Sequence, residues 1–301
     1  MALNRRDIEF STVDGTTLRG WFYSPGGSGG KRPCIIMANG ITGVKEQVLP
    51  GFAERFQAAN YGVLVYDYRN WGSSDGLPRE ETNPIQQSRD LSDAFDFALT
   101  LNEVDASKVV YWGTSMGGGV VLHAAALDKR ICAVISQVPF ISGEALVPLA
   151  APFLNVLYGN RQEVKAGKTP GLKKMFADTP EAALEGDPEA MLHDPNVHDF
   201  ILALKKSNKP WSPYVTTQSL LDMVAFEPLA FIHRIAPTPL LLIAADNDSC
   251  CNTSSQLKAY SQALEPKTLS ILKGCGHFDA CLGPGFEKNI KAQLNFLATT
   301  L

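Results

Sequence analysis

Residues 109–128 read VVYWGTSMGGGVVLHAAALD and join a β-branched run, a Gly-x-Ser-x-Gly pentad and an alanine-rich stretch. The apolar residues 109–112 are typical of a short buried strand in a parallel sheet. The alanine-rich residues that follow Ser115 predict a helix packed closely on that sheet. Gly113 and Gly117 are the tiny residues that a sharp turn from strand to helix requires. We therefore expect a strand–turn–helix unit with Ser115 at its turn.

The pentad alone does not decide whether Ser115 is a nucleophile. In a chain with 25 glycines among 301 residues, such a pentad arises by chance roughly once in eight chains, and a glycine-rich structural turn is the alternative interpretation. The predicted turn lifts the hydroxyl above the sheet at a helix N-terminus, whose partial positive charge stabilises a developing anion. A serine nucleophile also needs a base, an acid that orients the base, and an oxyanion hole.

The base should be a histidine just after a strand, because active sites in open parallel sheets lie beyond the carboxyl ends of the strands. The chain has five histidines. His123 lies inside a predicted helix, His233 precedes a strand, and His193 and His198 lie in a proline-rich segment. His277, in TLSILKGCGHFDA, directly follows a β-branched strand in a loop with glycines. We expect His277 to be the base, with a purely structural histidine as the alternative.

Two aspartates compete for the role of the acid. Asp246 and Asp248 stand in AADNDSCC, directly after the apolar strand PLLLIAA. Asp246 is expected at the strand end, where it can accept hydrogen bonds from loop amides. Asp248 lies farther out in the loop, where its carboxylate can reach His277. We therefore favour Asp248 as the acid and keep Asp246 as the alternative.

An oxyanion hole requires two backbone N–H groups. Met116, directly after the nucleophile, is expected to donate one of them. The loop after the strand CIIMA reads NGITG, and Gly40 and Gly43 allow a close approach of the backbone to a substrate. We expect Ile41 to donate the second N–H, with Thr42 as the alternative donor and as a contact to the substrate. An ordinary strand-to-helix loop would have a similar composition.

Along the chain, a hairpin is followed by alternating strands and helices. Residues 7–13 and 17–23 are predicted strands joined at Asp14-Gly15, a hairpin turn signal. From residue 34 onward, strand-like apolar runs alternate with helix-like segments. Such alternation predicts an α/β fold, with a mostly parallel twisted sheet covered by helices on both faces.

Prolines break this alternation over residues 139–237 and divide them into short helices and turns. The segment also contains many aromatic residues, and we expect Trp211 and Tyr214 among them to contact a substrate. We interpret the segment as a helical cap inserted before the last two strands. The domain prediction is therefore a core of residues 1–138 and 238–301 and a cap of residues 139–237.

The composition limits the function classes. The chain is 45% hydrophobic and 19% charged with a net charge of −4, and it has no lysine- or arginine-rich block of the kind that binds nucleic acid. The N-terminal MALNRRDIEF turns polar at once, and no apolar run approaches the length of a membrane span. The six cysteines lack metal-ligand spacing. We expect a cytoplasmic protein with reduced thiols and no metal, membrane or nucleic-acid partner, as a monomer or a homodimer.

Other reactive or charged residues near these motifs have simpler interpretations. Cys250 and Cys251 follow the candidate acid and Cys275 precedes the candidate base, but none stands at a strand-to-helix turn. We interpret these cysteines as small packing residues rather than as rival nucleophiles. Asp67 and Arg69, at the end of another predicted strand, are expected to fix a loop by an ion pair, with a contact to the substrate as the alternative.

Four motifs resemble those of the α/β-hydrolase superfamily, in family order and over nearly the whole chain: NGITG, GTSMG, DNDS and GCGHFD. The resemblance implies the α/β-hydrolase fold and the chain order Ser, Asp, His. YDYRNWGSSDGLPREE and GHFDACLGPGFEKNIKAQLNFL resemble a subgroup that includes fungal polyketide transferases and hydrolases of secondary metabolism. Asn39-Gly40 departs from the His-Gly of many relatives, but the oxyanion donors are backbone groups that this change need not impair.

These predictions combine into a serine hydrolase with a mostly apolar acyl pocket and no cofactor. Ser115 is expected to attack an ester or thioester carbonyl, His277 to take and return the proton, and Asp248 to orient the imidazole. The resemblance implies a small, polyketide-derived acyl substrate. The alternatives are an acyltransferase that uses an alcohol or amine acceptor, a lyase or cyclase on the same fold, and a binding protein with little turnover.

Overall fold

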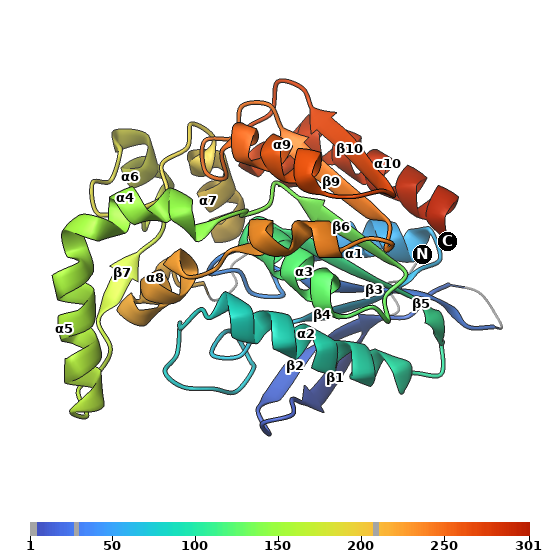
Figure 1. The fold of residues 1–301 in the computed structure, drawn as a ribbon, viewed down its shortest axis with the longest axis horizontal. Helices are drawn as coiled ribbons and strands as arrows, with labels where there is room; N and C mark the ends of the chain where they lie inside the picture. The colour runs from blue at the N-terminus through green and yellow to red at the C-terminus, as the bar shows by residue number, and fades with distance from the viewer. Residues whose placement is uncertain (1–4, 27–29, 207–210) are drawn as a thin grey trace.

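The computed structural model describes residues 5–26, 30–206 and 211–301, so the first four residues of the polar N-terminus lie outside the described residues. One eight-stranded sheet runs through the middle of the molecule, with helices on both faces (Figure 1). In spatial order its strands are β1 (Arg5–Ser11), β2 (Thr17–Tyr23), β4 (Gly62–Tyr66), β3 (Arg32–Ala38), β5 (Val104–Thr114), β6 (Ala133–Gln137), β9 (Leu240–Ala245) and β10 (Lys267–Leu272).

The sheet is mostly parallel. β1 and β2 form the predicted antiparallel hairpin, whose turn contains Gly15 with a φ of +85°, and β2 also pairs antiparallel with β4. The remaining neighbours, from β4 to β10, all pair in parallel. The predicted fold class, a mostly parallel sheet flanked by helices, is confirmed.

Helices cover the two faces of the sheet because alternate residues of each strand point to opposite sides. In β5, Val109 and Tyr111 belong to one core, and Val110 and Trp112 belong to the other. The first core is covered by α2 (Pro84–Leu99), α3 (Met116–Leu127) and α9 (Thr253–Gln262), and the second by α1 (Leu49–Ala58) and α10 (Gly283–Thr300). These continuous apolar strands, buried on both faces, hold the loops at their carboxyl ends in place.

Most of the segment between β6 and β9 gathers at one end of the sheet, on the left of Figure 1, whereas its last 3-10 helix, Pro228–Arg234, packs on α3. The segment contains a two-stranded antiparallel sheet that the proline pattern did not predict, because strands of three residues leave no periodicity to detect. Short 3-10 helices connect its other parts. Its elements are α4 (Val147–Ala150), α5 (Leu154–Lys165), β7 (Leu172–Lys174), α6 (Pro180–Glu185), α7 (Val197–Lys206), β8 (Tyr214–Thr216) and α8 (Thr217–Val224).

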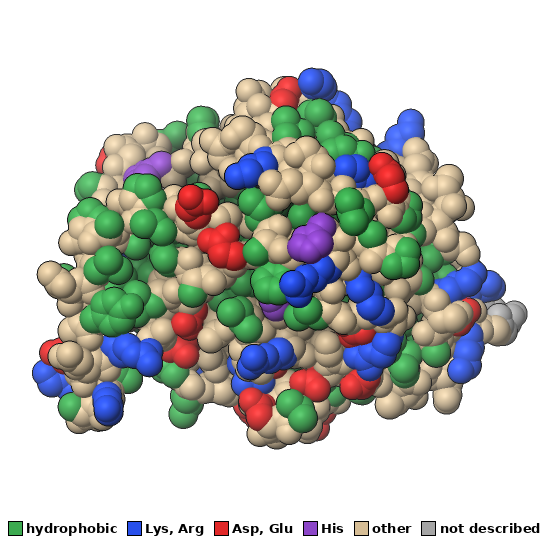
Figure 2. Space-filling model, in the orientation of Figure 1, with side chains coloured by type: hydrophobic (Ala, Val, Ile, Leu, Met, Phe, Trp, Pro, Cys, Tyr) green, Lys and Arg blue, Asp and Glu red, His purple; other side chains and the backbone are tan. Residues whose placement is uncertain are grey.

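The surface carries charges of both signs. Figure 2 shows lysine, arginine and acidic side chains dispersed over one face of the molecule, with apolar side chains between them. This distribution agrees with the absence of a basic block in the sequence. Among the described residues, no helix has the length and apolar character needed to cross a membrane.

Candidate active site

Ser115 stands at a strained turn between β5 and α3. Its backbone has a φ of 56° and a ψ of −123°, which a residue with a side chain rarely adopts. The flanking glycines make the turn possible: a Cβ at Gly113 would lie 2.1 Å from the carbonyl oxygen of Gly117, and a Cβ at Gly117 would lie 2.3 Å from that of Asn39. Such strain concentrates at functional sites, and here it presents the serine hydroxyl at the helix N-terminus.

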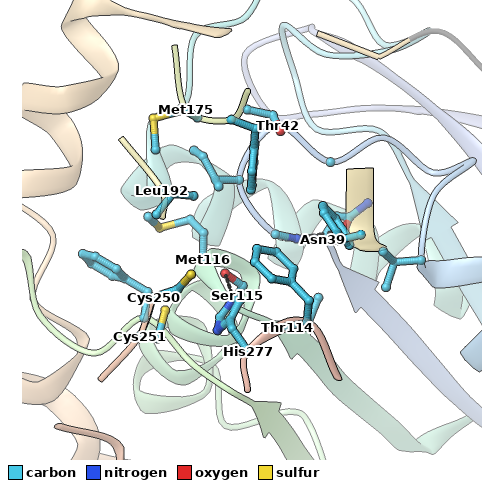
Figure 3. A pocket seen from close by; sticks show the side chains of 18 of the residues that line it. Asn39, Thr42, Thr114, Ser115, Met116, Met175, Leu192, Cys250, Cys251 and His277 are labelled. Carbon is cyan, nitrogen blue, oxygen red and sulfur yellow. Dashed lines mark hydrogen bonds between the residues drawn. The ribbon is translucent and has the colours of Figure 1, made fainter. Parts of the chain in front are cut away.

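His277 lies beside Ser115, although the two are far apart in the sequence. His277 follows β10, and its Nε2 is 3.0 Å from Ser115 Oγ. Its side chain is nearly enclosed, with the residue only 5% exposed. In Figure 3 the two side chains meet below Met116, with Cys250 and Cys251 beside them. The structure therefore brings the expected nucleophile and base within hydrogen-bond distance.

Asp248 completes a chain of hydrogen bonds on the far side of the imidazole. Its Oδ2 is 2.8 Å from His277 Nδ1 and also accepts a hydrogen bond of 2.8 Å from Gln256 Nε2. Its Oδ1 accepts the backbone N–H groups of Cys250 and Cys251 at 3.0 and 2.7 Å. Burial raises the pKa of Asp248, but His277, the Cys251 N–H and Gln256 together outweigh burial, so the pKa lies below its usual range. The carboxylate is thus held ionised against the imidazole.

Asp246 has the different place expected of it, at the end of β9. Its Oδ1 accepts the backbone N–H groups of Gly274 and Cys275 at 2.8 and 3.2 Å. Asp246 therefore ties the loop that carries His277 to the strand beside it, and no hydrogen bond joins it to the imidazole in the part of the chain that is described. Asp248 therefore contacts the imidazole and Asp246 anchors the loop, which are the places that their positions after β9 predict.

The loop after β3 lies directly against the serine. A Cβ at Gly40 would be 3.3 Å from Ser115 Cβ, so the backbone of this loop approaches the reactive hydroxyl closely. The N–H of Met116 belongs to the first turn of α3 and has no acceptor within the helix. Among the described residues, neither this N–H nor that of Ile41 donates a hydrogen bond to another backbone group. Both residues line the same pocket as Ser115.

Asn39 holds the shape of this loop, a role that sequence analysis missed. Its Nδ2 donates to the carbonyl oxygen of Val44 at 2.9 Å, and its Oδ1 accepts the N–H of Gly40 at 2.8 Å. A Cβ at Gly43 would lie 2.4 Å from Asn39 Cγ, so that glycine makes room for the amide. Asn39 thus supplies an internal brace for the loop.

A pocket of about 240 Å³ opens above Ser115. None of its described lining residues is an aspartate, glutamate, lysine or arginine. Apolar side chains from the segment between β6 and β9 form much of the wall. They are Phe140, Leu146, Met175, Phe176, Met191, Leu192, Phe200, Trp211 and Met223.

The three residues expected to contact a substrate take different positions. Thr42 and Trp211 both line the pocket, and Trp211 Nε1 donates to Thr42 Oγ1 at 3.2 Å. Tyr214 is not among the lining residues, because it lies in β8 with its hydroxyl 3.1 Å from Asp178 Oδ1. The aromatic composition of the segment predicted Tyr214 in the pocket, but that pattern does not distinguish the pocket wall from the outer strand pair.

The cysteines near the site have little nucleophilic character. Burial raises the pKa values of the Cys250 and Cys251 thiols, and nearby carboxylates raise them further. Burial also raises the pKa of Cys275. Asp248, Cys250 and His277 are close enough together to hold a metal ion, with ligand atoms within 4.8 Å of one another. The facing atoms of Asp248 and His277 are already hydrogen-bonded to each other, however, and a protonated thiol is a poor ligand.

A buried polar network supports the turn from below, and sequence analysis missed it too. Gln137 Nε2 donates to Thr114 Oγ1 at 2.9 Å, and Gln137 Oε1 accepts from Asn289 and Gln293 at 2.8 Å each. Gln293 in turn accepts the indole N–H of Trp112 at 2.6 Å. Polar residues at the buried end of a predicted strand and inside a predicted helix were the available signal. The network joins β5, β6 and α10 beneath the serine.

Comparisons with known proteins identify the family of the chain. The family described as serine aminopeptidase, S33, matches residues 30–278. The chain is 30% identical to the thiohydrolase aneE of Aspergillus aculeatus, over 98% of this chain and 93% of that protein. It is 32% identical to the polyketide transferase grgF of Penicillium sp, over 98% and 96%. It is 34% identical to the quorum-quenching protein AidA of Acinetobacter baumannii, over 97% and 93%.

A crystal structure shows the same similarity in three dimensions. The α/β-hydrolase GrgF from Penicillium sp. sh18 superimposes with a TM-score of 0.85 and 31% identity, covering 99% of both chains. The similarity therefore extends over the segment between β6 and β9 as well as over the sheet.

Proposed function

The chain belongs to the serine aminopeptidase S33 family of α/β-hydrolases, and on that premise we propose that it is a serine-dependent acyl hydrolase. Its substrate is a thioester or ester of a small, apolar, polyketide-derived acyl group. The segment of residues 139–237 acts as a cap over the acyl pocket. The observation that carries the proposal is the hydrogen-bonded series from Ser115 through His277 to Asp248, at a strained turn beside an apolar pocket.

In the first half of the reaction, Ser115 Oγ bonds to the acyl carbonyl carbon as its proton passes to His277 Nε2. The bond to the leaving thiol or alcohol breaks, and that group takes the proton from His277. Asp248 holds the imidazole with Nδ1 protonated and stabilises its positive charge. In the second half, water gives a proton to His277 and bonds to the acyl carbon, the serine ester breaks, and the proton returns to Ser115.

The N–H groups of Ile41 and Met116 stabilise the oxyanion that forms in both halves. Two donors fixed by the protein are effective because they need no reorganisation when the charge develops. The brace at Asn39 and the N-terminus of α3 supply that rigidity. Thr42 and Trp211, joined by a hydrogen bond, line this part of the pocket.

The pocket favours a neutral acyl chain over a peptide. A peptide with a free N-terminus would bring an ammonium group, which is costly to bury without an anionic partner. No aspartate or glutamate is among the described lining residues. An apolar cavity of about 150 Å³ holds benzene, so by proportion this pocket of about 240 Å³ holds about ten carbon atoms. The relatives named as thiohydrolase and polyketide transferase support a thioester-bound polyketide as the acyl donor.

Acyl transfer is the alternative function. An apolar pocket under a cap limits access of water to the acyl-enzyme and favours another nucleophile. Five relatives, grgF of Penicillium sp among them, are named polyketide transferases. We place hydrolysis first because transfer requires a second binding site for the acceptor, which must be held in position beside the ester.

A panel of synthetic acyl donors tests the proposal. It contains straight-chain thioesters and activated esters of two to sixteen carbons, the same chains with a terminal carboxylate or ammonium, and aminoacyl anilides. We expect the highest kcat/KM near eight to ten carbons, with a drop of at least about tenfold for chains that carry a terminal charge. Efficient release of aniline from the aminoacyl anilides, with slow ester and thioester cleavage, would contradict the proposed substrate class.

A further inference from the structure

A turn of the cap reaches down to the loop that carries His277. This cap turn consists of residues 194–196, which directly precede α7. The side chain of Asn196 donates from Nδ2 to Asp279 Oδ2 at 2.8 Å. The same carboxylate oxygen accepts the backbone N–H of Gly276 at 2.7 Å. Asp279 thus joins the cap to the peptide immediately before His277.

The cap turn also contacts the loop that carries Asp248. Asp194 is only 8% exposed, and both of its carboxylate oxygens accept hydrogen bonds. Its Oδ1 accepts the backbone N–H of Asn196 at 2.9 Å, which shapes the turn, and its Oδ2 accepts the hydroxyl of Ser249. Ser249 directly follows Asp248. The cap turn therefore contacts both the loop that carries His277, called the base loop, and the loop that carries Asp248.

Gly276 is shaped to receive this turn. A Cβ at Gly276 would lie 2.9 Å from Asn196 Nδ2 and 3.6 Å from Asp194 Oδ1. Its φ is not in the left-handed region, and an added Cβ would displace the side-chain amide of Asn196. The cap and the base loop are in direct contact at the residue before the imidazole.

We infer that the cap turn is a positioning device for the hydrogen-bonded series Ser115–His277–Asp248, so that the placement of the cap affects the chemical step as well as substrate binding. The inference rests on the proposed function and extends it. His277 lies in a loop with glycines at positions 274 and 276. Its ring contacts Ser115 and Asp248, and Asp246 anchors the loop at Gly274 and Cys275. Displacement of a reacting group by about 1 Å costs roughly a hundredfold in rate. Asn196 and Asp194 prevent that displacement from above.

The rate at which a fluorophosphonate labels Ser115 measures this positioning. A probe with a small alkyl group reacts only if Ser115, His277 and Asp248 are aligned, but it makes few contacts with the acyl pocket. Asn196→Ala should lower the labelling rate and the kcat for an acetyl thioester by about tenfold to a hundredfold, with KM close to that of the wild type. Asn160→Ala is the matched control, because Asn160 Oδ1 accepts the N–H of Gly171 at 3.1 Å within the cap and does not line the pocket. Its labelling rate should stay within about twofold of the wild type.

Substitutions of Asp279 separate a hydrogen-bonding role from a charge effect. Asp279→Ala removes the acceptor for both Gly276 and Asn196 and should reproduce the Asn196→Ala defect. Asp279→Asn keeps an oxygen that accepts both hydrogen bonds and should recover most of the labelling rate. The double variant Asn196→Ala/Asp279→Ala should label no more slowly than Asp279→Ala alone, because both changes break one connection.

The following results would overturn the inference that the cap turn positions His277. Wild-type labelling rates in folded Asn196→Ala and Asp279→Ala overturn the inference, and so does a rise in KM with an unchanged labelling rate. If Asn196→Ala does not fold, Asn196→Asp replaces the donor with an acceptor at constant size, and the same two readings apply to it. A wild-type protein that is not labelled at Ser115 at all would instead refute the proposed function, and this inference with it.

Discussion

At the scale of single residues, the two aspartates after β9 are held by different partners. Asp248 receives four hydrogen bonds, one of them from the imidazole, and is buried. Asp246 receives two backbone N–H groups of the base loop. Catalysis and stability should therefore respond differently to the same substitution at these two positions.

Asp248→Asn should lower turnover by about 10⁴ with little change in thermal stability, because the amide favours the wrong tautomer of His277. Asp246→Asn should lower the melting temperature and leave kcat within about tenfold, since it weakens only the anchoring of the loop. Steady-state kinetics and thermal denaturation of both variants provide the measurement. The reverse pattern would assign the role of the acid to Asp246.

Arg69 joins the first hairpin to α2, as expected of a residue that fixes loops. Arg69 Nη1 lies 2.8 Å from Asp14 Oδ2, and its Nη2 lies 2.6 Å from Asp90 Oδ1. Asp67, the other expected anchor, pairs instead with Lys45 Nζ at 2.6 Å. Both residues form ion pairs, but with separate partners rather than with each other.

Asp14 should contribute to the loss of stability in acid. The Arg69 guanidinium holds the pKa of the Asp14 carboxyl well below its usual range. A depressed pKa adds stability that is complete above the usual aspartate value, about 3.9, and is lost as pH falls through the lower folded value. Between about pH 5 and pH 2, Asp14→Asn should therefore lose less unfolding free energy than the wild type. Denaturant titrations at each pH measure the unfolding free energy of both proteins. If the two free energies fall by the same amount over this pH range, the assignment is contradicted.

Ser115 and His277 could be predicted because active sites in parallel sheets lie beyond the carboxyl ends of the strands. Ser115 and His277 each follow a predicted strand, so elimination among five histidines selected the one that lies beside Ser115. Asn39, Asp194 and Asn196 could not be found in this way. Their roles depend on close contacts between loops, and asparagine and aspartate are common in any loop.

At the scale of elements, the turn between β5 and α3 depends on the absence of side chains. Gly113 lies so close to Gly117 that a single methyl group cannot fit between their backbones. Gly159, in the middle of α5, has no atom within 4 Å of the position that its Cβ would occupy. These two glycines therefore allow the same substitution to be compared in a crowded turn and in an open helix.

Gly113→Ala should destabilise the protein by more than about 2 kcal/mol, because the Cβ would meet a backbone carbonyl that cannot move without opening the turn. Gly159→Ala should stabilise it by about 0.5–1 kcal/mol, because alanine loses less conformational entropy in a helix. Urea denaturation of both variants measures the two effects. A Gly113→Ala protein as stable as the wild type would show that the turn is not as crowded as described.

The elements of the sheet were predictable and those of the cap were not. Buried parallel strands are continuous apolar runs, so their alternation with helices is evident in the sequence. Even there β5 begins at Val104, earlier than its apolar run indicates. The cap is built from helices of four to twelve residues and strands of three, too short for a hydrophobic period to appear.

At the scale of the whole molecule, strand order and cap placement determine which loops meet. The alternation pattern predicts a parallel sheet but not the order β4-β3-β5-β6-β9-β10, which brings the loops after β3, β5, β9 and β10 to one edge. Residues between β6 and β9 supply much of the pocket wall at that edge. Pairing between distant strands depends on the packing of the complete chain, which local patterns do not contain.

The cap should protect the acyl-enzyme without converting the protein into a transferase. With one thioester donor, the product should remain almost wholly the free acid when millimolar alcohols or amines are added, since no acceptor site holds them in place. Chromatographic analysis of the products measures this partition between water and acceptor. Ester or amide as the main product would show that acyl transfer is the function.

The most direct test of the account is to trap the acyl-enzyme. Wild-type protein mixed with a medium-chain thioester and quenched in acid within the first turnover should carry the acyl mass on the peptide that contains Ser115. Ser115→Ala should remain folded, carry no acyl group and turn over about 10⁴ to 10⁶ times more slowly. Thioester cleavage with no acyl group on that peptide, or a Ser115→Ala rate within about tenfold of the wild type, would contradict the proposed mechanism.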